Sequence, residues 1–242
     1  MSILQTLNRV YKQQSFNPNL IGLLLNPFYF IRKRIYESIA SFAPALEGKL
    51  LDFGCGSKAY KSLFTVDEYI GLDVEQSGHT HENEEVDVYY DGKVIPFDDN
   101  TFDSCFSSEV FEHVFELEAS LQEINRVLKP GGKGLFVVPF VWDEHEVPYD
   151  FGRYSSFGLH YLLEKHGFEV VKSKKDAHFA VVIAQLWNLY LFNLGPTQKY
   201  LRLLYGMLVI APFTLFWSVL LLVLPKIDTL YFNNVTLVRK KG

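Results

Sequence analysis

The run at residues 49–57, KLLDFGCGS, constrains the fold of this chain more than any other feature. It is a short apolar segment that ends at Asp52 and passes directly into a turn containing Gly54 and Gly56. Glycine tolerates backbone angles that other residues resist, and its missing side chain lets a ligand lie against the backbone. A strand that enters such a turn and then a helix is typical of doubly wound sheets. The run therefore predicts an α/β fold with a nucleotide-like ligand at this turn.

A second apolar run ends at Asp73, about 20 residues after the turn, which is the spacing of a ribose-binding acid. An acid at this place can accept hydrogen bonds from both ribose hydroxyls, or it can simply cap the end of the strand. Ala59 stands three residues after Gly56, and some dehydrogenases permit alanine there, so this turn alone is compatible with a dinucleotide as well.

Three segments together resemble the class I S-adenosylmethionine-dependent methyltransferases of type 11. Residues 52–58 are similar to motif I of that family, Asp/Glu-x-Gly-x-Gly-x-Gly, with Lys58 in place of the third glycine. Residues 91–103 are similar to its run Gly-Asp-Ala-x-x-Leu-Pro-Phe … Ser-Phe-Asp, and residues 126–132 match its run Arg-Val-Leu-Lys-Pro-Gly-Gly. The resemblance covers residues 45–172 and excludes the dinucleotide alternative, because dehydrogenases do not carry this combination.

The resemblance implies S-adenosylmethionine as the cofactor and a Rossmann-like α/β sheet of order 3-2-1-4-5-7-6 with an antiparallel last strand. It also implies that the Asp91 carboxylate accepts from the adenine amino group while the Gly92 N–H donates to a ring nitrogen. The cofactor-binding residues implied in this way are Asp52, Gly54, Gly56, Asp73, Asp91 and Gly92.

The apolar pattern along the chain agrees with alternating strands and helices. Pro130 cannot continue a helix, and the two glycines after it predict a turn into the next strand. We expect strands at 49–53, 68–73, 86–90, 102–107, 133–139, 168–174 and 233–240. We expect helices at 28–42, 58–64, 116–128 and 155–166.

The loop after the fifth predicted strand, residues 139–155, concentrates polar and aromatic groups at the sheet edge where ligands bind. It resembles a signature, His-Glu-x-Pro-x-Asp-Phe-x-Arg-Tyr-Thr/Ser, of methyltransferases from bacterial glycan and lipid-linked sugar pathways. Because methylation of a hydroxyl requires removal of its proton, we predict His145 as the general base. Predicted helpers are Glu144 or Glu146, which would orient the base, and Arg153 or Tyr154, which would hold substrate. Alternatively, Asp150 and Arg153 form an ion pair that fastens the loop, and His145 only makes hydrogen bonds.

Other polar residues receive weaker interpretations. His113 follows the fourth predicted strand, where we interpret it as a residue packing under the cofactor, and Glu109 is a weaker candidate base. No metal site is predicted. His79, His81 and Glu82 are interpreted as part of a solvated loop, and a metal at His145, Glu146 and Asp150 has no spacing that demands it.

An apolar segment interrupts the chain between the last two predicted strands. Leu203–Leu224 is uncharged over 22 residues, roughly 33 Å as a helix, and Phe179–Leu194 is a second uncharged run. Both ends of the segment must return to one sheet, so a single crossing of a membrane is excluded. Lys199 and Arg202 near the predicted tip also resist passage through hydrocarbon, so we predict a monotopic hairpin. A soluble lid or a homodimer interface would hide the same apolar surface.

The charge distribution agrees with this assignment. Residues 61–171 hold seven Lys/Arg and 23 Asp/Glu, which argues against a nucleic-acid partner. Residues 172–242 hold nine Lys/Arg and two Asp/Glu, which suits anionic headgroups. The expected divisions are an N-terminal helical segment at 1–44, a methyltransferase domain at 45–177 and 226–242, and the hairpin insert at 178–225.

The predicted function is S-adenosylmethionine-dependent methylation, at oxygen, of a small-molecule, glycan or lipid-linked acceptor. We expect a cytoplasmic protein held at the inner membrane face as a peripheral or monotopic protein, since the first residues lack the compact apolar core of a signal peptide. The two cysteines, Cys55 and Cys105, predict reduced thiols. The alternatives are a soluble methyltransferase whose insert forms a homodimer interface and a protein that binds S-adenosylmethionine without catalysis.

Overall fold

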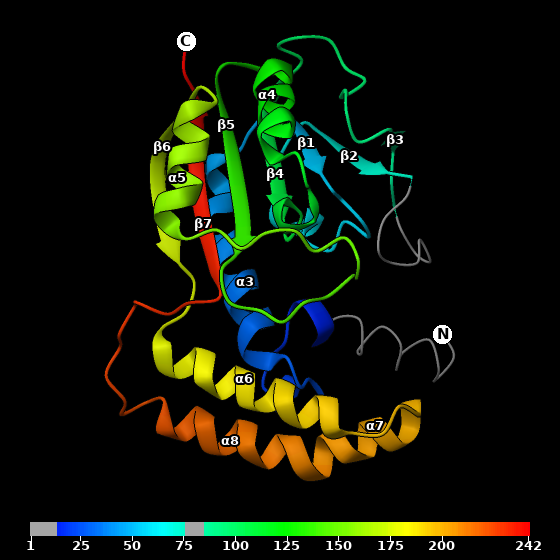
Figure 1. Cartoon of the computed structure of the whole chain (residues 1–242), viewed down its shortest axis with the longest axis vertical. Coiled ribbons are helices and arrows are strands. Elements are labelled where there is room, and N and C mark those ends of the chain that lie inside the picture. Colours follow the sequence, from blue (N-terminus) through cyan, green and yellow to red (C-terminus); the bar gives the residue numbers. More distant parts are fainter. Residues whose placement is uncertain (1–13, 76–84) are drawn as a thin grey trace. The chain divides into compact units, whose positions relative to one another are not determined.

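A seven-stranded sheet organises the computed structural model, which describes residues 14–75 and 85–242. The strand order is β3-β2-β1-β4-β5-β7-β6, as predicted, and β7 is antiparallel to both β5 and β6. The strands are β1 (Lys49–Phe53), β2 (Glu68–Val74), β3 (Val88–Tyr90), β4 (Phe102–Ser108), β5 (Leu128–Pro139), β6 (Phe168–Lys175) and β7 (Asn233–Lys240). Figure 1 shows this sheet with α4 and α5 beside it.

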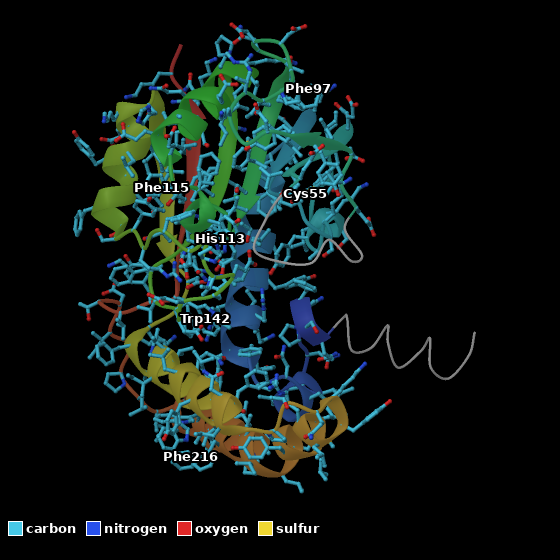
Figure 2. All side chains as sticks on the ribbon, turned by 45° about the vertical axis from the view of Figure 1, so that its right-hand side comes forward. Cys55, Phe97, His113, Phe115, Trp142 and Phe216 are labelled. Carbon is cyan, nitrogen blue, oxygen red and sulfur yellow. The ribbon has the colours of Figure 1, made fainter. Side chains whose placement is uncertain are left out.

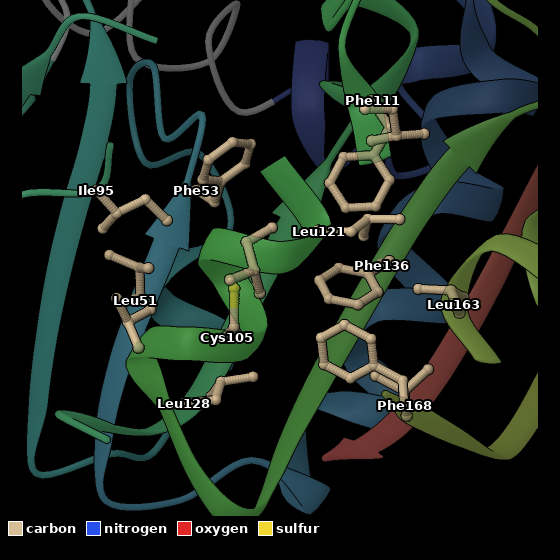
Figure 3. Packing of buried hydrophobic residues seen from close by; sticks show 14 of the residues in the cluster. Leu51, Phe53, Ile95, Cys105, Phe111, Leu121, Leu128, Phe136, Leu163 and Phe168 are labelled. Atoms are coloured by element: carbon tan, nitrogen blue, oxygen red, sulfur yellow. The ribbon is translucent and has the colours of Figure 1, made fainter. Parts of the chain in front are cut away.

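Helices pack apolar side chains against the central strands. In α4 (Leu117–Val127), Leu117, Leu121 and Ile124 recur at helical spacing and are buried. They join a core with strand residues such as Phe136 and with α5 (Ser156–Lys165), as Figure 3 shows. These helices confirm the predictions for 116–128 and 155–166, and α3 (Tyr29–Phe42) confirms the one for 28–42. Cys55 and Cys105 are buried and free.

Two local predictions were wrong. Residues 58–64 form no α-helix but only a 3₁₀ turn, η2 (Lys61–Leu63), because Lys58 takes a φ of 48° and leaves the helical region at the start of the segment. The strand expected at 133–139 begins at Leu128, so the glycines after Pro130 lie inside β5 rather than in a turn. The pairing of β5 with β4 shifts register there, which accommodates Gly131 at a φ of 78°.

The chain divides into two compact units. One comprises residues 38–175 and 233–242, which include the whole sheet, and the other comprises residues 176–232 with the described part of residues 1–37. The insert and the N-terminal segment therefore cluster together. Residues 1–12, on which the expectation of no signal peptide rests, and His79, His81 and Glu82 lie outside the described residues.

The insert is a pair of helical arms between β6 and β7. The first arm is α6 (Phe179–Leu194), and the second consists of α7 (Lys199–Tyr205), a π-helical turn, η4 (Gly206–Ile210), and α8 (Ala211–Leu220). The Asn188 side chain donates to the Thr214 hydroxyl at 2.9 Å and joins the arms, which lie alongside each other in Figure 1. Gln185 accepts from the Phe30 N–H at 3.1 Å, so α6 is also fixed to the start of α3.

The second arm has the dimensions of a membrane span. Lys199–Leu220 is a helical stretch of 22 residues, and 17% of its most apolar part is buried. Exposed apolar side chains along it include Leu208, Phe216 and Val219. Pro212 lies in the first turn of α8, directly after the π-helical turn, which is a common way to accommodate an irregularity within a helix.

Candidate functional site

The predicted site residues follow the ends of neighbouring parallel strands. Strands β1 to β5 pair in parallel in the order β3-β2-β1-β4-β5, so their carboxyl ends meet at one edge of the sheet. The turn after β1, the acid in β2, the loop after β4 and the loop after β5 are all at this edge. Ligands of doubly wound sheets bind at such an edge.

The glycine turn after β1 packs closely on one side and is open on the other. Gly54 takes a φ of 73°, and an added Cβ would lie 2.4 Å from a methyl carbon of Val110 in the loop after β4. Gly56 takes a φ of 45°, and an added Cβ would meet no atom within 4 Å. Gly54 therefore brings the two loops together, while Gly56 presents bare backbone to the space in front of the turn.

Two buried aspartates stand beside this turn. Asp73 accepts from the Gly56 N–H at 2.8 Å and from the Val74 N–H at 2.8 Å, which ties the glycine turn to the end of β2. Asp52 accepts from the Tyr69 hydroxyl at 2.6 Å. Burial, opposed in part by that hydrogen bond, raises the pKa of Asp52 to about 7. A cation bound near Asp52 would offset the cost of ionising it.

Asp91 and Gly92 follow β3, next to the end of β2. Asp91 is exposed, and its Oδ1 accepts from the Lys93 N–H at 2.9 Å and from the Val94 N–H at 3.3 Å. These backbone bonds lower the pKa of the carboxyl. Gly92 takes a φ of 78°. The structure thus places both residues at the predicted edge, and the adenine contact stays a prediction.

Lys58, which stands where the family has a glycine, keeps the conformation that glycine favours. Its φ is 48°, and its Nζ lies 2.5 Å from Asp87 Oδ2 while only 4% of its side chain is exposed. The side chain crosses β2 at Gly71, where an added Cβ would lie 2.4 Å from the Lys58 Cε. The same Asp87 oxygen accepts from the Gly71 N–H at 2.6 Å. Lys58 and Asp87 thus fasten the turn to β2 in place of a following helix.

The loop after β4 holds a buried acid beside a histidine. Glu112 has no exposed side-chain surface, and within the described structure neither of its carboxylate oxygens has a hydrogen-bond partner. Burial and the neighbouring charge of Glu109 raise its pKa. Glu109 itself has a φ of 58°, a conformation that a residue with a side chain rarely adopts. The backbone carbonyl of Glu112 accepts from the Phe151 N–H at 2.7 Å, which fixes the 139–155 loop against this one.

His113, labelled in Figure 2, is held through one ring nitrogen. Its Nδ1 lies 2.7 Å from the Tyr149 carbonyl oxygen, which can only accept, so Nδ1 carries a proton and donates it to that oxygen. Nε2 lies 3.8 Å from Glu112 Oε1 and 3.8 Å from Glu146 Oε2. His113 therefore faces two carboxylates, and its packing under a cofactor stays a prediction.

His145 is held in a similar way. Its Nδ1 lies 3.2 Å from the Asp143 carbonyl oxygen and 3.3 Å from Asp150 Oδ2, so the proton is again on Nδ1. The ring centroids of His113 and His145 are 4.7 Å apart at an interplanar angle of 79°. Asp150 thus contacts His145, which the sequence did not predict, and orientation of His145 by Glu144 or Glu146 stays a prediction. Glu144 is exposed.

Arg153 forms the ion pair that the sequence offered as the alternative to substrate binding. Its two terminal nitrogens lie 2.5 Å and 2.8 Å from the two oxygens of Asp150. Burial raises the pKa of Asp150, but the Arg153 hydrogen bonds and the His145 N–H outweigh it and lower the pKa to about 2. Arg153 also donates to the Asp143 carbonyl at 3.0 Å. Whether it also contacts substrate stays a prediction, as do the roles of His145 and Glu144.

Sequence reasoning missed Glu112. The signal that points to it is an acid next to a histidine directly after the carboxyl end of a central strand. One carboxylate oxygen of Glu112 and one nitrogen each of His113 and His145 lie within 4.8 Å of one another, a set that could hold a metal ion.

Comparisons with known proteins agree with this fold and edge. Residues 51–136 match a family model described as a methyltransferase domain. A malonyl-[acyl-carrier protein] O-methyltransferase of Erwinia pyrifoliae is 32% identical over 94 residues, which are 36% of this chain and 36% of that protein. An uncharacterized protein of Methanocaldococcus jannaschii is 36% identical over 126 residues, 50% of this chain and 54% of that one. The matched region thus spans about half, or less, of these relatives.

Solved structures share the fold at low sequence identity. Phosphoethanolamine N-methyltransferase 2 of Haemonchus contortus, in complex with S-adenosyl-L-methionine, is similar with a TM-score of 0.51 and 18% identity. The match covers 100% of this chain and 60% of that one. Residues 51–136 thus match a methyltransferase-domain family, and the strand order and the solved structure agree with the fold of that domain.

Proposed function

We propose that this chain is a methyltransferase that transfers the methyl group of S-adenosylmethionine to a hydroxyl oxygen of a lipid-linked or glycan acceptor at the cytoplasmic face of a membrane. One observation carries the transfer. The glycine turn and the polar cluster of Glu112, His113 and His145 share one sheet edge, and Val110, which packs against Gly54, lies two residues before Glu112. A cofactor in the turn would thus present its methyl group beside polar groups that can handle a hydroxyl.

In this reaction the methyl group passes directly from the cofactor to the acceptor, so the protein forms no covalent bond to either. The acceptor oxygen forms a bond to the methyl carbon as the bond from carbon to the sulfonium sulfur breaks, and that electron pair stays on sulfur. Catalysis then consists of positioning the two reactants and removing the hydroxyl proton, for which His145 is the predicted base. An oxygen acceptor is supported by the Erwinia relative, which is named an O-methyltransferase.

The membrane part of the proposal rests on the insert. Lys175, at the end of β6, pairs with Asn234 near the start of β7, so the chain leaves and returns at adjacent points of the sheet. An insert that begins and ends at one place fits a hairpin that enters one leaflet rather than a single span. Its second arm exposes apolar side chains over 22 residues, more than a solvated helix needs.

The test is incubation of the full chain with methyl-labelled S-adenosylmethionine and a bacterial extract divided into lipid and water-soluble fractions. We expect label in a species that partitions into organic solvent and whose methyl resists mild base, as an ether does. At a concentration of S-adenosylmethionine below the dissociation constant of the wild type, the Gly56→Ala variant should transfer much less label. Label only in water-soluble products would favour the soluble alternative. Cofactor binding without any transfer would overturn the catalytic proposal.

A further inference from the structure

We infer that Glu112, His113 and His145 form a binding site for one divalent transition-metal ion at the carboxyl edge of the sheet. One oxygen of Glu112 and one nitrogen of each histidine already lie within 4.8 Å of one another. In a tetrahedral site with bonds of about 2 Å, ligand atoms are roughly 3.3 Å apart. Small side-chain movements therefore suffice to close the three groups around an ion.

The two histidines are arranged as metal ligands usually are. A ligating histidine donates its other ring N–H to a carbonyl or carboxylate, which fixes its tautomer and its orientation. His113 does so through the Tyr149 carbonyl at 2.7 Å, and His145 through the Asp143 carbonyl at 3.2 Å and Asp150 at 3.3 Å. In its neutral form, each ring would offer Nε2 to an ion.

Glu112 supplies a separate indication of a missing cation. Its side chain is fully buried and both carboxylate oxygens lack a hydrogen bond in the described structure, an arrangement that strongly disfavours the ionised group unless a cation lies beside it. The nearby charge of Arg153 offsets part of this, but its terminal nitrogens donate to Asp150 and to the carbonyls of Asp143 and Gly152 rather than to Glu112. A single general base would need one histidine and would leave the buried acid unexplained.

The donor set indicates the class of ion. Two imidazoles and one carboxylate suit Zn²⁺ and neighbouring first-row ions better than Ca²⁺ or Mg²⁺. The side chains of His113 and His145 are 15% and 31% exposed, so one side of the ion would stay open to a further ligand. Glu146, whose Oε2 lies 3.8 Å from the His113 Nε2, is within reach as a fourth protein group.

The chemical role of the ion rests on the proposed function. An acceptor hydroxyl oxygen at the open position would lose its proton to water, because a bound divalent cation lowers the pKa of oxygen ligands. The alkoxide then takes the methyl carbon, the carbon–sulfur bond breaks, and sulfur keeps the electron pair. In this arrangement His145 is a ligand and not the base.

The direct test is metal uptake by the full chain after treatment with a chelator. Zn²⁺ titrated by calorimetry should bind with a stoichiometry of one, and Co²⁺ should give visible absorption bands of nitrogen and oxygen ligation. Glu112→Gln and His113→Asn should each weaken binding at least tenfold. Glu118→Gln is the matched control, because Glu118 also pairs with a histidine, His166, at 3.0 Å but outside the cluster, and it should bind as the wild type does.

Two results would overturn the site: no uptake by the wild-type chain, or uptake that neither variant changes. Thermal unfolding and S-adenosylmethionine binding report whether a variant is folded. The site and the proposed function fail separately. If methyl transfer persists in chelated protein, the ion has no role in the transfer, and the proposed function stands. If one ion binds but no methyl transfer occurs, the proposed function is wrong, and the metal site stands.

Discussion

Among single residues, Asp52 is the one from which we expect the clearest pH dependence of cofactor binding. Burial raises its pKa to about 7 in the protein without ligand, so the carboxyl is mostly protonated at pH 6 and mostly ionised at pH 8. The cationic S-adenosylmethionine favours the ionised form, so binding should release a proton and the dissociation constant should fall by about tenfold from pH 6 to pH 8. Calorimetry in two buffers of different ionisation enthalpy measures the released proton.

Asp52→Asn is the control for this linkage. The ligand's own amino group titrates in both proteins, so only the difference between them belongs to Asp52. The variant should show a flatter pH dependence. If wild type and variant show the same slope, Asp52 does not contact the charged part of the cofactor.

Lys58 and Asp87 allow a second test at this scale. Removing the Asp87 carboxylate would leave the buried Lys58 ammonium and the Gly71 N–H without that acceptor. Because Asp87 itself is half-exposed, we expect a loss of about 1–3 kcal/mol in the free energy of unfolding for Asp87→Ala. The matched exposed substitution Asp98→Ala should change stability by less than about 0.5 kcal/mol. Urea denaturation measures both, and equal losses would contradict the role of the pair.

At the scale of elements, the glycine turn can be probed with three matched substitutions. Gly56→Ala places a methyl group in open space in front of the turn, so the protein should fold while its affinity for S-adenosylmethionine falls at least tenfold. Gly131→Ala carries a similar backbone cost at a φ of 78°, also with no atom within 4 Å, but far from the site, and should bind the cofactor normally. Gly54→Ala meets Val110 and should lose both stability and affinity. Equal affinity for Gly56→Ala and Gly131→Ala would exclude the cofactor from this turn.

Most of the sheet could be predicted because its signals are local. Apolar runs that end at Asp52 and Asp73 mark strands, and a helix that stops before Pro130 marks the entry to β5. The helix after the turn could not be excluded, because nothing in residues 58–64 reveals that Lys58 adopts a left-handed backbone. A local sequence pattern indicates only the propensity to form a helix. In the structure, Lys58 instead has a left-handed backbone and forms an ion pair with Asp87.

The cluster of Glu112, His113 and His145 could be predicted only in part, because local sequence patterns do not show which loops meet in the fold. His145 stood out within its own loop, but Glu112 lies 33 residues earlier and shows its buried, unpaired state only when the loops after β4 and β5 are side by side. Asp150 likewise contacts His145 through the fold of the loop rather than through sequence adjacency. Elements follow from periodicity, whereas a site assembled from several loops requires the topology.

For the whole molecule, the open question that the structure makes testable is what covers the apolar second arm of the insert. Burying one large apolar side chain is worth about 1.5–3 kcal/mol, so replacing two exposed ones by charges should weaken membrane binding by well over tenfold. Leu208 and Phe216 are 67% and 59% exposed. We expect the wild-type chain to sediment with vesicles of mixed neutral and anionic lipid, and the Leu208→Glu/Phe216→Glu variant to stay in solution with unchanged affinity for S-adenosylmethionine.

Phe157 supplies the matched control for this experiment. It is 84% exposed on α5, in the unit that contains the sheet, and Phe157→Glu should bind vesicles as the wild type does. Gel filtration separates the alternative, because an insert that covers its apolar arm with a second copy of the chain would give a dimer without lipid. In that case the wild-type chain would not sediment with vesicles, and the two insert substitutions would convert the dimer to a monomer. Since Lys175 at the end of β6 pairs with Asn234 at the start of β7, an insert bound to a membrane would have to return the chain to the side on which it left.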